Sequence, residues 1–312
     1  MTERSRVQIA FTHDFQEACD LRDQGYEPIE CAFGQYGSVM GQYNMDHHGA
    51  ESHREGVALR ACRDHFGARS HDPRFVVTGT PDADAVLAII ALAGLVDASL
   101  IQPDFYRLVD QYDVDPIGID LLSSPLGQQL AWFNQLTDLR QSQAGFERGV
   151  DGMVSLLTGG LDQKRVQQVV KSERNRLRTA AKGIIKSLAR DGMELPVSLV
   201  DETSQVRRGE FARFGASRVV VVHSNVWGFD VWYRAAPIVV SYAERIQKIT
   251  VGCPDRETAE LLFGPGGLKK VWAHMGRGWG GRESIGGSPR GVVCALSDAF
   301  ATAEALLPLL DE

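Results

Sequence analysis

The segment from residue 74 to residue 96 constrains the fold most strongly. Residues 74–78 are rich in β-branched and aromatic side chains, which predicts a short strand. Pro81 then introduces a turn, and residues 83–96 are apolar on nearly every side of a helix. Such a helix has to be buried, so we expect it to pack against the sheet to which the strand belongs. A strand followed by a buried helix indicates an α/β layer.

The residues before this segment extend the same pattern. Alternation over residues 7–11 predicts a first strand, residues 15–24 a helix, and residues 27–33 a second strand. We expect a further helix over residues 52–66, in which Ser52 and Glu55 form a capping box. Because open α/β sheets bind ligands beyond the carboxyl ends of their strands, the loops that follow these strands are the candidate site.

The second half of the chain reads as a helical connector followed by a smaller α/β unit. Residues 146–191 have a helical, charged pattern, and residues 197–200, 219–222, 238–240 and 292–296 are candidate strands. We therefore expect an α/β protein with two domains. The first has a parallel sheet and covers residues 1–191 with the connector, and the second, smaller domain covers residues 192–312.

Composition limits the classes of function. The chain has 312 residues, a formal net charge of -7 and 44% hydrophobic residues, so it is a globular protein without a basic surface for long nucleic acid. The basic run at residues 164–186 predicts a solvated helix face, with a nucleic-acid contact as the alternative. No signal peptide is evident, and the longest apolar run, residues 85–96, is too short to cross a membrane. The five cysteines include no C-x-x-C pair, which favours reduced thiols in a cytoplasmic protein.

Acidic and imidazole residues gather in three stretches that we expect at strand ends. Carboxylates and imidazoles are the ligands with which two-metal phosphoesterases hold ions about 3.5–4 Å apart. The candidate metal ligands are Asp46, His47, Asp82, Asp84 and Asp110. Adjacent residues of an extended loop point in different directions, so His48 is a candidate to contact the substrate or to protonate the leaving group. Asp113 is the second candidate catalytic residue. The alternative is that these acids only cap helices and form turns.

A glycine-rich stretch at residues 276–291 contains three arginines. Glycines allow successive backbone N–H groups to converge on an anion, and arginine can bind phosphate oxygens in a fork. A mobile surface loop is the alternative interpretation. The candidate substrate-binding residues are Gly280, Gly281, Arg282, Ser284, Gly286, Gly287, Ser288 and Arg290.

Four motifs together resemble the DHH phosphoesterase superfamily. Asp46-His47-His48 matches the triplet that names the family, and residues 75–88 are similar to its strand, Pro-Asp-x-Asp-Ala turn and apolar helix. Residues 109–113 are similar to the later aspartate motif, and residues 280–287 have the spacing of the Gly-Gly-His-x-x-Ala-Ala-Gly substrate loop. The resemblance implies two lobes, with divalent metals in the first and phosphate recognition in the second.

The chain departs from the family pattern in several places. Asp46-His47-His48 precedes the Asp-x-Asp motif instead of following it, and Thr78 stands where a histidine is usual. The aspartate usually found upstream of the triplet has no clear match, and Glu30, or His13 with Asp14, are the alternatives for it. Two metals, one metal or none are therefore all compatible with the sequence.

From these observations we expect a metal-dependent phosphohydrolase. Its substrate would be a small phosphorylated compound such as a short oligonucleotide, a nucleotide or a polyphosphate, with no long nucleic acid or membrane as partner. The metal would be Mn²⁺, with Mg²⁺, Co²⁺ or Zn²⁺ as alternatives. The alternative function is a phosphate- or nucleotide-binding protein that keeps the DHH-like fold and lacks catalysis.

Overall fold

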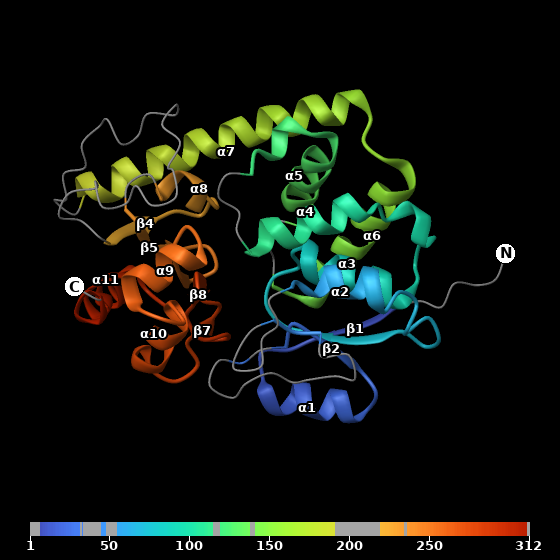
Figure 1. Cartoon of the computed structure of the whole chain (residues 1–312), viewed down its shortest axis with the longest axis horizontal. Helices are drawn as coiled ribbons and strands as arrows, with labels where there is room; N and C mark the ends of the chain where they lie inside the picture. Colours follow the sequence, from blue (N-terminus) through green and yellow to red (C-terminus); the bar gives the residue numbers. More distant parts are fainter. Residues whose placement is uncertain are drawn as a thin grey trace. The chain divides into compact units, whose positions relative to one another are not determined.

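The computed structural model describes most of the chain (Figure 1). The described residues are 7–31, 33, 45–47, 55–114, 119–137, 141–190, 219–233 and 236–310. Contacts divide the chain into two compact units: Met1–Val114 with Ile119–Lys171, and Asp115–Gly118 with Ser172–Glu312. Each unit is described separately below.

A three-stranded parallel sheet lies at the centre of the first unit. Its strands are β1 (Gln8–Phe11), β2 (Glu27–Ile29) and β3 (Arg74–Val77), arranged in the order β1-β3-β2. Both neighbours run parallel to β3, so the three carboxyl ends lie at one edge of the sheet. The prediction of an α/β fold with a parallel sheet is confirmed.

The alternating side chains of β3 bury both faces of this sheet. Val76 packs with Ala18 and Cys31 under helix α1 (Phe15–Asp23), whereas Phe75 and Val77 belong to the larger core on the opposite face. The helices α2 (Val57–Asp64) and α3 (Ala83–Ala93) contribute to that larger core. In Figure 1, α1 accordingly lies on one side of the strands, with α2 and α3 on the other.

Helix α3 is buried along its whole length, as its composition predicts. Every residue from Ala83 to Ala93 is buried, and the helix ends at Gly94, whose φ of 61° is left-handed. Such a conformation favours glycine. The first turn of α3 follows the central strand directly, so Asp84 is carried into the interior by the apolar residues around it.

The remaining helices of the first unit follow α3. They are η2 (Ala98–Leu100), α4 (Pro103–Val114), η3 (Leu121–Ser123), α5 (Pro125–Thr137), α6 (Gln143–Gly159) and α7 (Gln163–Arg190), which continues into the second unit. The interpretation of the acidic stretch around Asp110 as a strand end is wrong. Asp110 and Asp113 lie three residues apart on α4, so they share one face of a helix.

The second unit contains a five-stranded mixed sheet. In the order β4-β5-β6-β8-β7, its strands are β4 (Val219–His223), β5 (Ile238–Ala243), β6 (Lys248–Gly252), β8 (Ile285–Gly287) and β7 (Gly280–Gly281). The first pair is parallel and the others are antiparallel. The helices are α8 (Phe229–Trp232), α9 (Arg256–Phe263), α10 (Leu268–Met275), α11 (Leu296–Leu306) and η6 (Leu307–Leu309).

The strands expected at residues 219–222 and 238–240 are confirmed. The closing strand expected at residues 292–296 is wrong, because this segment has no regular structure before α11 begins at Leu296. Val292 and Val293 are 49% and 68% exposed, so their β propensity is not used in a sheet. The strand expected at residues 197–200 lies outside the described residues. Among the described residues, none of the helices combines the length and the hydropathy of a membrane span.

Candidate metal centre

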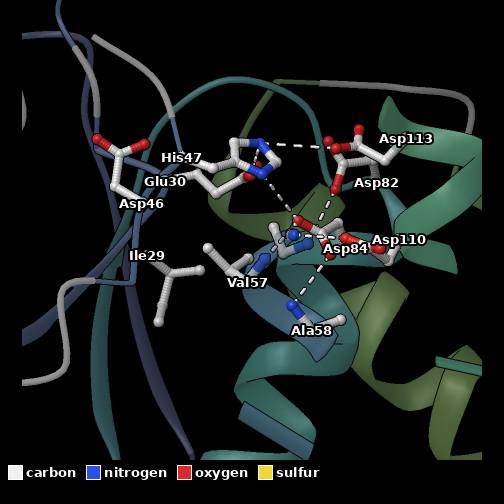
Figure 2. A network of polar contacts seen from close by, with 12 residues as sticks. Ile29, Glu30, Asp46, His47, Val57, Ala58, Asp82, Asp84, Asp110 and Asp113 are labelled. Carbon is white, nitrogen blue, oxygen red and sulfur yellow. Dashed lines mark hydrogen bonds and ion pairs between the residues drawn. The ribbon is translucent and has the colours of Figure 1, made fainter. Parts of the chain in front are cut away.

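Three buried side chains from different segments meet beyond the carboxyl edge of the parallel sheet (Figure 2). Glu30 follows strand β2 directly, His47 lies in the described stretch 45–47, and Asp84 lies in the first turn of α3 after strand β3. The potential ligand atoms of these three residues all lie within 4.8 Å of one another. We call this group the metal cluster.

The imidazole of His47 lies between carboxylates. Its Nε2 is 2.7 Å from Oε1 of Glu30 and 3.6 Å from Oδ2 of Asp113, and its Nδ1 is 3.7 Å from Oδ2 of Asp84. Although Oε1 of Glu30 is close to the ring, it is buried and receives no well-aligned hydrogen bond. An oxygen placed in this way is available as a ligand for a cation.

An unusual backbone conformation places Glu30. Its φ of 51° is in the left-handed region, which is uncommon for a residue other than glycine. The Glu30 N–H donates a hydrogen bond of 2.8 Å to the carbonyl oxygen of Met45. This bond fastens the end of β2 to the stretch that carries His47, and the surrounding structure therefore holds both side chains in place.

The amino terminus of α2 is bound by two carboxylates from distant elements. The N–H groups of Val57 and Ala58 donate to Oδ2 and Oδ1 of Asp84 at 2.9 and 3.0 Å, and the N–H of Gly56 donates to Oδ1 of Asp110 at 2.5 Å. These bonds satisfy donors that a helix leaves free at its start. The expectation that a Ser52 capping box begins this helix is wrong, because Gly56 is its N-cap.

Gly56 is required by the closeness of these carboxylates. A Cβ added at this position would lie 2.6 Å from Oδ1 of Asp84 and 3.0 Å from Oδ1 of Asp110. The φ of Gly56 is -61°, which any residue adopts. Glycine is therefore needed here because a side chain would not fit, and not because of the backbone conformation.

Arg60 is a buried cation on α2 on which the charges of Asp84, Asp46 and Glu30 act. Its Nη2 donates to the backbone carbonyl of Asp46 at 2.9 Å, which ties the stretch before His47 to helix α2. Burial lowers the pKa of the Arg60 guanidinium, while the charges of Asp84 and Asp46 oppose that shift. Sequence reasoning missed both Arg60 and Gly56, whose roles depend on contacts between distant segments.

The carboxylates are crowded and desolvated. Burial, followed by the charges of nearby acids, raises the pKa of both Asp84 and Asp113 well above the usual range, and burial also raises the pKa of Asp110. Acids held this close repel one another unless a cation offsets their charge. A buried imidazole nitrogen and carboxylate oxygens are suitable ligands for a divalent metal ion. The residues present therefore fit such an ion.

The structure brings most of the predicted metal ligands and catalytic residues together. His47 and Asp84 belong to the metal cluster, and Asp110, Asp113 and Asp82 lie around it (Figure 2). The carboxylate of Asp46 is buried but points away from the cluster in Figure 2. His47 therefore enters the cluster and Asp46 does not, although the two residues are adjacent in the chain (Figure 2). His48 lies outside the described residues.

Asp82 is engaged as a helix cap. Its Oδ1 accepts a hydrogen bond of 2.9 Å from the N–H of Ala85, so Asp82 is the N-cap of α3. Since Asp84 similarly binds the start of α2, both aspartates have a use that requires no metal. This is the observation that favours a structural role for the Asp-x-Asp motif.

The two alternatives for the missing upstream aspartate occupy different places. Glu30 lies in the metal cluster, whereas Nδ1 of His13 lies 3.4 Å from Oγ1 of Thr78, across the carboxyl ends of β1 and β3. Asp14 accepts a hydrogen bond of 2.8 Å from the N–H of Glu17 and is the N-cap of α1. Glu30, one of the alternatives named from the sequence, follows the parallel strand β2 directly, where open α/β sheets bind ligands.

Asp14→Ala is expected to destabilise the protein by about 1 kcal/mol, because the variant loses an N-cap. Its metal content should equal that of the wild type, since Asp14 does not belong to the metal cluster. Urea unfolding and elemental analysis of the same preparation measure both quantities. A loss of bound metal in this variant would show that Asp14 and not only Glu30 contributes to the centre.

The glycine-rich stretch of the second unit forms a tight hairpin. Added Cβ atoms at Gly281 and Gly286 would lie 2.2 Å from Cα of Gly286 and 2.5 Å from the Trp272 ring, so these glycines permit close packing. Gly280 and Gly287 are paired across the same hairpin. Arg282 and Ser284 are buried, and Oγ of Ser288 accepts a hydrogen bond from the backbone of Ile249.

Comparison with models of protein families, with curated proteins and with solved structures finds no match for this chain.

Proposed function

We propose that the protein is a divalent-metal-dependent phosphohydrolase that acts on a small phosphorylated substrate. The observation that carries this proposal is the buried cluster of Glu30, His47 and Asp84 at the carboxyl edge of a parallel sheet. Two further observations support the proposal: the raised pKa values of Asp84 and Asp113, and the similarity of the sequence motifs to those of DHH phosphoesterases. When bound, a divalent cation supplies Lewis-acid chemistry, which activates water and neutralises phosphate charge.

The residues of the cluster have distinct tasks in this proposal. Glu30, His47 and Asp84 would hold the ion. The amino terminus of α2, which Asp110 also binds, fixes the orientation of Asp84. Asp113 contacts His47 through Oδ2, yet 31% of its side chain is exposed. It therefore reaches from the buried cluster to solvent, where it is placed to orient the attacking water or the leaving group by hydrogen bonding.

The experiment that tests this function is a turnover assay on full-length protein that has been stripped with a chelator and reloaded. Mn²⁺, Mg²⁺, Co²⁺ and Zn²⁺ are supplied in turn, with pyrophosphate, polyphosphate, nucleotides and dinucleotides as substrates. We expect turnover with at least one metal, and His47→Gln should lower it on the order of a thousandfold. Asp151→Asn, an exposed change on α6, is the matched control and should keep full activity.

The rival is a binding protein that has lost catalysis. It is favoured by the fact that Asp82 and Asp84 both bind helix amino termini without any metal. It predicts no turnover with any of the four metals, together with ligand binding that survives chelation. Equal turnover in the wild type and His47→Gln would exclude the metal cluster as the catalytic centre.

A further inference from the structure

Two charged side chains of the second unit lie next to the glycine hairpin, Lys248 on the neighbouring strand β6 and Arg290 just after strand β8. Lys248 is the first residue of β6, and its Nζ donates a hydrogen bond to the carbonyl oxygen of Pro289. Pro289 immediately precedes Arg290, so this bond holds the Lys248 ammonium against the backbone next to Arg290, whose charge acts on it. This arrangement is fixed by pairing of β6 with β8, the strand that leads into Pro289.

The surroundings leave these two cations without an acidic partner. Within the described residues, no carboxylate forms an ion pair with Lys248 or Arg290. The Nη1 atom of Arg290 is fully buried and has no hydrogen-bond acceptor. Burial is the main reason that the pKa of Lys248 falls to about 8, with Cys294 opposing the shift and the charge of Arg290 adding to it.

Two partly buried like charges are unfavourable unless an anion joins them. A buried donor without an acceptor has a similar cost, and both costs disappear when one oxyanion accepts from both side chains. Arginine and lysine are the side chains with which proteins bind phosphate groups. Lys248 was not among the candidate residues from the sequence, because nothing in its local pattern shows that Arg290 lies beside it.

We propose that Lys248 and Arg290 together form a binding site for a doubly charged oxyanion, the phosphate group of a small molecule. Arg290 donates through Nη1, and Lys248 donates through the hydrogens of its ammonium that Pro289 does not use. This proposal is independent of the metal centre in the first unit. It holds whether or not the protein is a hydrolase.

Sulfate is the first probe, because it has the shape and charge of the phosphate group and does not titrate in the neutral range. Its binding to the full-length protein is measured by calorimetry at constant ionic strength, with chloride as the replaced anion. Lys248→Met and Arg290→Gln should each weaken binding at least about tenfold. Lys270→Met is the matched control, because Lys270 is an exposed lysine on α10, and it should bind as the wild type does.

The pH dependence provides a second readout. The titratable or charged groups that act on Lys248 are Cys294, a thiol, and Arg290, a cation. Since the ammonium is lost as the pH rises through about 8, sulfate affinity should fall between about pH 7 and pH 9.5 in the wild type and in Lys270→Met. In Lys248→Met, the weaker binding that remains should be nearly constant over the same range.

Two further arms complete the test. Arg290→Lys keeps the positive charge but lacks the planar set of N–H donors of the guanidinium. Its sulfate affinity should therefore lie between those of the wild type and Arg290→Gln. Pyrophosphate and a nucleoside monophosphate, compared with inorganic phosphate, distinguish a free anion from a phosphate group carried by a larger molecule. Equal sulfate affinity in Lys248→Met and Lys270→Met would overturn the proposal, as would the absence of sulfate binding by the folded wild type.

Discussion

Glu30→Gln is expected to weaken Mn²⁺ binding by at least about a hundredfold, because Glu30 supplies one of the three groups of the metal cluster. Glutamine keeps the length of the side chain and removes its charge. Glu30 caps no helix among the described residues, so this substitution tests the cluster without disturbing α2 or α3. For Asp84 the two effects would be mixed, since its carboxylate also binds Val57 and Ala58.

The same variant should have opposite effects on the metal-free and metal-loaded proteins. Without metal, removing one of several crowded carboxylates relieves repulsion, so Glu30→Gln should be at least as stable as the wild type. With metal at about a hundred times its dissociation constant, the wild type should gain about 2.7 kcal/mol, and the variant should gain little. Thermal unfolding with chelator and with added Mn²⁺ measures both values.

Glu257→Gln is the matched control, because Glu257 is an exposed residue of α9. It should show the metal-dependent gain of the wild type. An equal gain in Glu30→Gln would mean that the ion binds elsewhere. Lower stability of Glu30→Gln in chelator would mean that Glu30 has a structural role that the crowding argument does not include.

Gly56→Ala should destabilise the metal-free protein by about 2–4 kcal/mol, through overpacking and through weakened hydrogen bonds to charged groups. The added methyl group would lie 2.6 Å from Oδ1 of Asp84, which is held by the N–H groups of Val57 and Ala58. Either the carboxylate or the start of α2 has to move. The displacement of Asp84 should also weaken metal binding, so the variant should be impaired in both measurements.

Gly159→Ala provides the control for this substitution. Gly159 is the last residue of α6, and an added Cβ there meets no atom within 4 Å. Because alanine restricts the unfolded chain, this change should stabilise the protein by about 0.4–1 kcal/mol. Urea unfolding of both variants measures the difference. If Gly56→Ala were as stable as Gly159→Ala, Asp84 and Asp110 would not press against α2 as described.

The local sequence contained enough information to predict the central part of the fold. The alternation in β3 and the apolar composition of α3 are properties of short segments. Both elements could therefore be predicted without knowing any contact between distant residues. The strand predicted at residues 292–296 shows the limit of this approach, because a β-branched run forms a strand only when another strand is available to pair with it.

The candidate site was less predictable because its geometry depends on distant contacts. Motif reading found His47, Asp84 and Asp110, but the location of Asp110 on helix α4 and its bond to Gly56 follow from packing between helices. Glu30 enters the cluster because β2 pairs with β3, which no local pattern specifies. The different directions of Asp46 and His47 (Figure 2) are set by the backbone path of residues 45–47, which the motif does not specify.

The central claim is that His47 and its two acidic neighbours hold one divalent ion. Pulsed electron paramagnetic resonance of the Mn²⁺-loaded protein, prepared without a histidine tag, tests this claim most directly because it detects nitrogen coordinated to the ion. We expect a histidine nitrogen coupling in the wild type that disappears in His47→Gln under the same metal concentration. A spectrum without nitrogen coupling, or a coupling that persists unchanged in His47→Gln, would contradict the assignment of this cluster as the metal centre.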